Sequence, residues 1–173
     1  MINITTYFAS FSEPIFAIST AEDSALCDSL WHLADNTAQQ IAVRVCRGSK
    51  MRTVQGVFDE FAAAFQFPYY FGENWPAFKE CLTDLSWLPA SAYVVCISKA
   101  DQLLADSAPS FEVLIRNLII VARGWSGETP DLAVSGQSPT PFHVLLQVPV
   151  GSDHAVLNRL ASVGTSADII TSF

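Results

Sequence analysis

Residues 67–85 read FPYYFGENWPAFKECLTDL, an aromatic turn followed by a short amphipathic helix. Asn74 is a good N-cap for this helix, because its short polar side chain can accept a hydrogen bond from a free backbone N–H group. Pro76 falls in the first turn, where a missing N–H group costs nothing. On a helical wheel, the apolar face consists of Trp75, Phe78, Leu82 and Leu85.

The opposite face of this predicted helix is acidic. Glu80 lies almost opposite the centre of the apolar face, and its neighbours on the outer surface are Pro76, Lys79, Thr83 and Asp84. Residues 59–84 hold five acids (Asp59, Glu60, Glu73, Glu80 and Asp84) and one cation, a net charge of −4 and half of the chain's −8. Glu80 and Asp84 repel each other at a spacing of four, and a cationic partner would reverse that penalty. The alternative interpretation is a solvated acidic face without a partner.

Elements on both sides of this stretch alternate between strand and helix. Apolar runs predict strands at residues 15–18, 41–46, 93–98, 142–148 and 167–171. Helical spacing predicts helices at residues 21–34, 53–67, 109–123 and 154–163, the first with Thr20 as candidate N-cap and the third ending at Gly124. Residues 125–141 are the longest loop candidate. This order predicts an α/β fold with a mainly parallel sheet flanked by helices.

The sequence resembles the barstar family, intracellular inhibitors of a secreted ribonuclease. The resemblance rests on the turn PYYFGEN at residues 68–74, the helix WPAFKECLT at residues 75–83, and the order strand, long helix, motif, strand, helix, strand. It covers about residues 41–149. It implies a barstar-like α/β fold for a single domain spanning residues 1–173, with extra N-terminal and C-terminal elements.

The resemblance also implies a binding surface. In the family, the turn and the short helix plug the enzyme's active site, and a helix carboxylate meets the basic residues that bind phosphate. Glu80 matches that carboxylate, Tyr70 and Asn74 match contact positions in the turn, and Trp87 matches an aromatic residue just past the helix. The expected partner-binding residues are therefore Tyr70, Asn74, Pro76, Lys79, Glu80, Thr83, Asp84 and Trp87.

Some positions depart from the family pattern. Pro76 stands where a second interface acid is expected, and Lys79 stands where a tryptophan is expected. The helix at residues 109–123 offers Ile119 and Arg123 where further acids are expected. The resemblance therefore predicts the fold and a binding role more firmly than it predicts the identity of the target.

Composition narrows the partner class. A net charge of −8 and a pI near 4.6 argue against nucleic acid and anionic membrane surfaces as ligands, because both require a basic surface. A basic protein surface is the natural complement. No signal-peptide pattern or apolar run of bilayer length is visible, so the cytoplasm is the expected location.

Motifs for cofactor, metal or covalent chemistry are not found in the sequence. The cysteines at 27, 46, 81 and 96 form no Cys-x-x-Cys pair and lie in apolar stretches, which predicts small core side chains in a reducing compartment. No two of His32, His143 and His154 fall at metal-ligand spacing. No P-loop, dinucleotide fingerprint or nucleophile elbow is present. We therefore expect no catalytic residue, cofactor or metal.

These observations favour a bacterial immunity protein, an antitoxin that binds and occludes the active site of a cognate toxin. The toxin would be a ribonuclease or another nuclease with a basic cleft. Two alternatives stay open: a barstar-like interaction module with a non-nuclease partner or with itself, and a small α/β hydrolase with its site at the strand carboxyl ends. The sequence assigns no role to residues 1–40 or 125–141, and it leaves the oligomeric state open.

Overall fold

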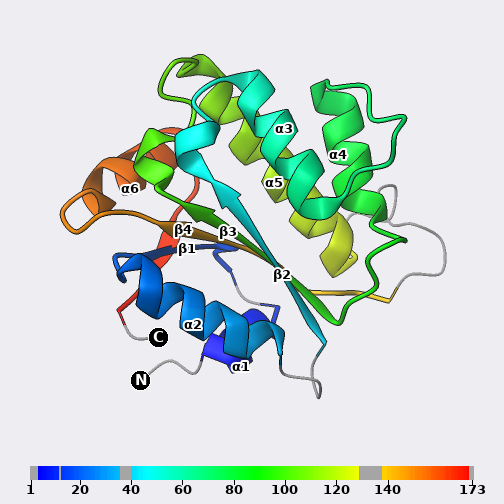
Figure 1. The fold of residues 1–173 in the computed structure, drawn as a ribbon, viewed down its shortest axis with the longest axis horizontal. Helices are drawn as coiled ribbons and strands as arrows, with labels where there is room; N and C mark the ends of the chain where they lie inside the picture. The colour runs from blue at the N-terminus through cyan, green and yellow to red at the C-terminus, as the bar shows by residue number, and fades with distance from the viewer. Residues whose placement is uncertain (1–3, 12, 36–39, 129–137, 172–173) are drawn as a thin grey trace.

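The computed structural model describes residues 4–11, 13–35, 40–128 and 138–171 and contains one five-stranded sheet (Figure 1). The strands lie in the order β2-β3-β4-β1-β5, and every neighbouring pair is parallel. Their bounds are β1 (Phe16–Ser19), β2 (Ile41–Arg47), β3 (Ala92–Ser98), β4 (Phe142–Gln147) and β5 (Ala167–Ile170). The prediction of an α/β fold with a parallel sheet is confirmed.

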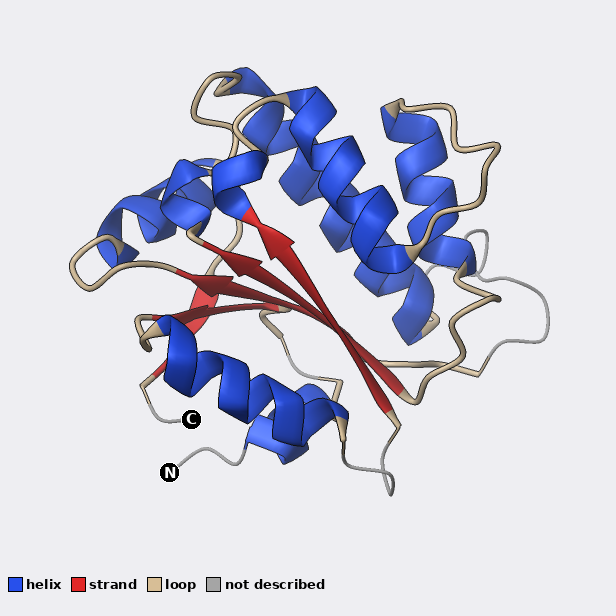
Figure 2. Ribbon diagram, in the orientation of Figure 1, coloured by secondary structure: helices blue, strands red, loops and turns tan. Residues whose placement is uncertain are grey.

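Helices cover both faces of this sheet. They are α1 (Ile4–Phe8), α2 (Asp23–Ala34), α3 (Val54–Phe65), α4 (Trp75–Asp84), α5 (Pro109–Ser126) and α6 (Asp153–Ser162), with short 3₁₀ turns η1 (Gly48–Lys50) and η2 (Ala100–Gln102). In Figures 1 and 2, α3, α4 and α5 lie on one side of the sheet, and α1 and α2 lie on the other.

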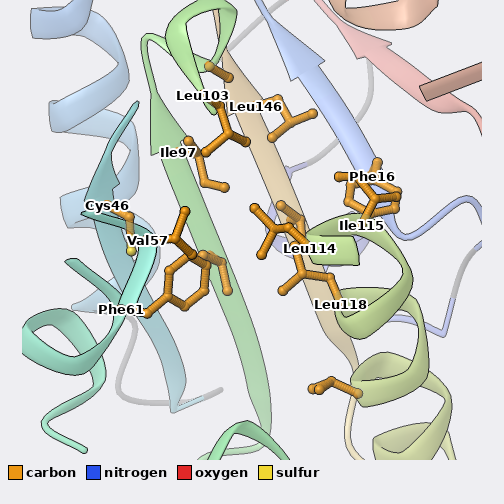
Figure 3. Packing of buried hydrophobic residues seen from close by; sticks show 14 of the residues in the cluster. Phe16, Cys46, Val57, Phe61, Ile97, Leu103, Leu114, Ile115, Leu118 and Leu146 are labelled. Atoms are coloured by element: carbon orange, nitrogen blue, oxygen red, sulfur yellow. The ribbon is translucent and has the colours of Figure 1, made fainter. Parts of the chain in front are cut away.

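Alternation along the strands divides the interior into two cores. In β3, Val95 and Ile97 belong to the larger core, under α3–α6, whereas Val94 and Cys96 belong to the smaller core under α1 and α2. This is the expected result of successive side chains pointing to opposite faces of a sheet. Figure 3 shows the larger core, where Val57 and Phe61 of α3 and Leu114 and Leu118 of α5 point toward the strands.

The terminal segments complete the sheet. β1 lies between β4 and β5, so the first and last strands of the chain pair with each other. The hydroxyl group of Tyr7 in α1 donates to Asp168 Oδ2 in β5 at 3.0 Å, which ties the two ends together. The extra N-terminal and C-terminal elements are therefore integral parts of the fold.

Several predicted element ends differ from the structure. α2 begins at Asp23 and is preceded by Glu22, whose side chain makes no cap hydrogen bond, so Thr20 is not the N-cap. α5 continues through Gly124, which is buried, and ends at Ser126, with Gly127 as its C-cap in the left-handed conformation (φ +81°). Helices commonly end where a glycine turns left-handed, and here that residue is Gly127 instead of Gly124. Part of the predicted loop at 125–141 is thus helical, and residues 129–137 lie outside the described residues.

Candidate protein-binding surface

The ends of α4 are set by local hydrogen bonds. Asn74 Oδ1 accepts from the Ala77 N–H group at 3.0 Å, and Asn74 Nδ2 donates to the Gly72 carbonyl at 2.9 Å. Asn74 is thus the N-cap, as predicted, and Pro76 lies in the first turn. At the other end, Leu85 is left-handed (φ +39°) and its N–H group reaches the Cys81 carbonyl at 3.2 Å.

The inner face of α4 packs on other helices. Phe78, Cys81 and Leu82 are buried, and the Phe78 ring contacts the rings of Phe58 and Phe61 in α3, with centroids 6.0 and 4.9 Å apart. The indole N–H of Trp125 in α5 donates to the Leu82 carbonyl at 2.9 Å. α4 is therefore fixed to α3 and α5, and its other side faces outward (Figure 1).

The turn before α4 separates buried from exposed aromatics. Phe71 packs on Phe58 and Phe67, with centroids 5.8 and 4.9 Å away, and its N–H group donates to the Pro68 carbonyl at 2.9 Å. Tyr69 is fully exposed, and Tyr70 is 64% exposed. Burial of Phe71 thus leaves the two tyrosines to solvent, where their rings contact edge to face at 5.7 Å.

All eight expected partner-binding residues lie on this turn, on α4 or just beyond it, but their exposure differs. Tyr70, Asn74, Pro76 and Glu80 are exposed, whereas Lys79, Thr83, Asp84 and Trp87 are half-buried. The Thr83 hydroxyl group donates to the Lys79 carbonyl at 2.8 Å, and Asp84 Oδ1 accepts from the Ser86 N–H group at 3.3 Å. Exposed Glu80 therefore lies among residues with local hydrogen bonds.

Trp87 has a structural contact. Its indole N–H donates to the Phe65 carbonyl at 2.9 Å, and its ring packs against the larger core. This hydrogen bond holds the residue that follows α4 against the end of α3. Only the exposed part of the Trp87 ring is open to a partner.

The acids of residues 59–84 are not equally free. Glu60 accepts from both the backbone N–H and the guanidinium Nε of Arg47, each at 3.0 Å, and its side chain is only 11% exposed. Hydrogen bonds from Arg47 lower the pKa of Glu60 below its ordinary value. In the sequence Glu60 counts toward the net charge of −4 over residues 59–84, but Arg47 at the end of β2 offsets its charge in the structure. Arg47 and Glu60 are 13 residues apart, so the sequence alone does not reveal that they pair.

Two residues outside the predicted set also belong to this surface. Tyr69 is fully exposed beside Tyr70. Gln55, in the first turn of α3, donates from Nε2 to Asp59 Oδ1 at 3.0 Å and to Glu73 Oε2 at 2.8 Å. The consecutive tyrosines were visible in the sequence, but nothing there joins Gln55 to Glu73.

The carboxyl ends of the strands, where the hydrolase alternative would have its site, border an open hollow of about 600 Å³. Its walls are residues 20–24, Lys99 and residues 147–150. The Gln147 side chain is buried there: its oxygen accepts from the Lys99 N–H group at 2.8 Å, and its nitrogen donates to the Ala21 carbonyl at 3.2 Å. The lining includes Ser24 but neither histidine nor cysteine, so this hollow contains no Ser–His or Cys–His pair.

The cysteines only partly match their prediction. Cys46, Cys81 and Cys96 are buried, and burial raises the pKa of Cys96 to about 12, so that thiol stays protonated. Cys27 is exposed, because α2 buries Leu26, Leu30 and Leu33 and Cys27 lies outside that stripe. Within the described ranges, no group of three or more His, Cys, Asp or Glu residues is arranged to hold a metal ion. No described helix is long and apolar enough to cross a bilayer.

Comparison with known families gives one match. The family model described as Barstar (barnase inhibitor) matches residues 41–147, more than half of the chain. The matched segment runs from β2 through β4 and includes α3, α4 and the turn between them. No curated protein matches the chain.

Proposed function

The chain belongs to the barstar family, and we propose that it is an immunity protein that binds a cognate toxin and occludes its active site. The toxin is a ribonuclease, or another nuclease, with a basic cleft. The observation that carries this proposal is the outer surface of α4 with its turn: two exposed tyrosines and Glu80 on a helix whose other face is buried.

The chemistry of this surface suits a phosphate-binding cleft. Such a cleft must be cationic, and an exposed carboxylate on a rigid helix can meet its basic residues as a phosphate group would. Tyrosines supply large contact area at low cost in conformational entropy, and they are enriched where interfaces concentrate their binding energy. Because α4 is fixed at both caps, little order has to be gained on binding.

The departures at Pro76 and Lys79 bear on which toxin is bound. Pro76 is exposed and carries no charge, and Lys79 places a cation beside Glu80. A partner that fits this surface would have fewer cations opposite α4 than a cleft built to meet two acids there. It would present an acid or a polar group opposite Lys79.

Capture and inhibition test the proposal together. The immobilised protein should capture a basic nuclease from extracts of its own cell, and an equimolar amount of the chain should abolish that nuclease's activity. Glu80→Lys should lose both effects with an unchanged circular dichroism spectrum and melting temperature, because exposed substitutions usually change stability by less than about 0.5 kcal/mol. The matched control is Asp28→Lys, the same charge change at an exposed position of α2 across the sheet.

Other outcomes identify the alternatives. Capture of a regulator without nuclease activity would contradict the immunity role and support an interaction module. Capture of only further copies of this protein would contradict it and support self-association. Equal inhibition by the wild type and Glu80→Lys would exclude α4 as the inhibitory element.

A further inference from the structure

One amide group joins α3 to the turn that carries the exposed tyrosines. Gln55 Nε2 donates to Asp59 Oδ1 at 3.0 Å, one helical turn along α3, and to Glu73 Oε2 at 2.8 Å, at the end of the turn before α4. In the described part of the chain, no other side-chain hydrogen bond connects residues 68–73 with α3. The polar side of this turn is therefore held to its platform by Gln55.

The opposite side of the turn is held by aromatic packing. Phe71 lies on Phe58 and Phe67, and Trp75 lies on Phe58 with centroids 5.0 Å apart. Phe58 and Gln55 are three residues apart on α3, so they lie on the same side of that helix. The turn is thus attached to α3 at two places: by aromatic packing on Phe58 and by the hydrogen bond from Gln55.

The hydrogen bonds of Gln55 stabilise the position of Glu73, which is not part of the aromatic packing. Glu73 is left-handed (φ +47°), a conformation that is strained for a residue other than glycine. Asp59 and Glu73 share a donor, so their carboxylates lie near one another and repel. Without the Gln55 amide, both effects favour movement of Glu73 away from α3, and the neighbouring turn would follow.

We propose that Gln55 is a positioning residue of the binding surface: its amide holds Glu73, and through it the Tyr69–Tyr70 turn, against α3 in the conformation that the partner meets. This inference rests on the proposed function for its role in binding. A turn already held in the bound conformation loses less conformational freedom on association, and this mainly slows dissociation.

Three substitutions at this exposed position separate the hydrogen bond from the charge. Gln55→Met keeps the length of the side chain and removes the donor. Gln55→Glu keeps the shape and replaces the donor with a third carboxylate. Gln55→Lys restores a donor that can reach both acids, and it serves as the rescue variant.

The free protein gives the first readout. ¹⁵N order parameters for residues 69–73 should fall in the Met and Glu variants and recover in the Lys variant, while those of residues 75–84 stay at rigid values. Unchanged order parameters in the Met and Glu variants would overturn the proposal whatever the partner is.

Binding to barnase gives the second readout. The Met variant should dissociate about five-fold faster at an unchanged association rate, the size expected for the net contribution of one typical hydrogen bond. The Glu variant should associate faster, because it adds negative charge, and should still dissociate faster. Faster association with unchanged dissociation would mean that residue 55 acts only through rim charge, contrary to positioning. If wild type and Glu80→Lys bind barnase equally, α4 is not the binding element and the proposed function fails. If neither binds, the cognate nuclease differs from barnase, as the departures at Pro76 and Lys79 imply, and the order parameters decide the role of Gln55.

Discussion

The two faces of the sheet are covered in different ways. On the smaller core, α2 packs directly on the strands through Leu26, Leu30 and Leu33. On the larger core, α3 and α5 cover the strands, and α4 packs on those two helices rather than on the sheet (Figures 1 and 2). A helix in this outer layer is anchored along one side and presents the other to a partner, so the layer arrangement explains why the candidate surface lies on α4.

Removing one anchor from each face should give the largest contrast. Phe78→Ala empties the contact between α4 and α3, and it should lower the free energy of unfolding by about 3–5 kcal/mol. Leu30→Ala should cost about 2–5 kcal/mol in the smaller core. Urea denaturation measures both losses, and calorimetry at a temperature where both variants are folded measures binding to the captured nuclease. We expect only Phe78→Ala to weaken binding; an equal loss of affinity in both would contradict the assignment of the surface to α4.

Local signals in the sequence predicted α4 well. Contacts between residues far apart in the chain could not be predicted from the sequence. The cap at Asn74 and the apolar stripe of α3 depend on neighbours within one or two helical turns, so the sequence contains them. The position of β1 between β4 and β5 depends on pairing between the ends of the chain. The same limitation applies to Glu60 with Arg47 and to Gln55 with Glu73, where the partners are 13 and 18 residues apart.

The two exposed tyrosines allow a comparison of two positions within the candidate surface. Tyr70→Ala should speed dissociation from the nuclease by about 30-fold, the effect of removing an anchor worth about 2 kcal/mol. The family resemblance places Tyr70, and not the neighbouring Tyr69, at a contact position, so Tyr69→Ala should have a smaller effect. Surface plasmon resonance at one salt concentration compares the two. A larger effect at Tyr69 would shift the centre of the surface away from α4.

Acid should lower the free energy of unfolding through His143, which lies on the side of the smaller core. His143 of β4 is buried against α1: its Nε2 lies 2.8 Å from the Ser10 carbonyl oxygen, and its ring centroid is 5.4 Å from that of Tyr7. Burial lowers the pKa of His143 below its ordinary value near 6.5. The unfolded chain therefore takes up a proton in a range where the folded chain does not, and stability falls as pH drops below about 6.5.

Unfolding by urea at pH 7.5 and pH 5.5 tests this effect. The loss should be at most about 1.4 kcal/mol, the value of one pH unit for one group. His143→Gln keeps a donor for Ser10 and does not titrate, so its stability should change little between these pH values. The lowered pKa values of Glu60 and Asp106 act below about pH 4.5, outside this range. An equal loss in wild type and variant would exclude His143 as the cause.

The proposal depends on the surface of α4 and the turn before it binding the basic cleft of a nuclease. The salt dependence of the association rate tests this most directly. Stopped-flow association with the captured nuclease should slow steeply between about 0.05 and 0.5 M salt, while dissociation changes little. Asp59→Asn, on this face, should slow association at low salt, and Asp28→Asn on the opposite face should not. Lys79→Glu should bind more weakly if the partner presents an acid there, and faster binding would mean that this lysine is only tolerated. A flat salt dependence, or equal effects of Asp59→Asn and Asp28→Asn, would contradict the account.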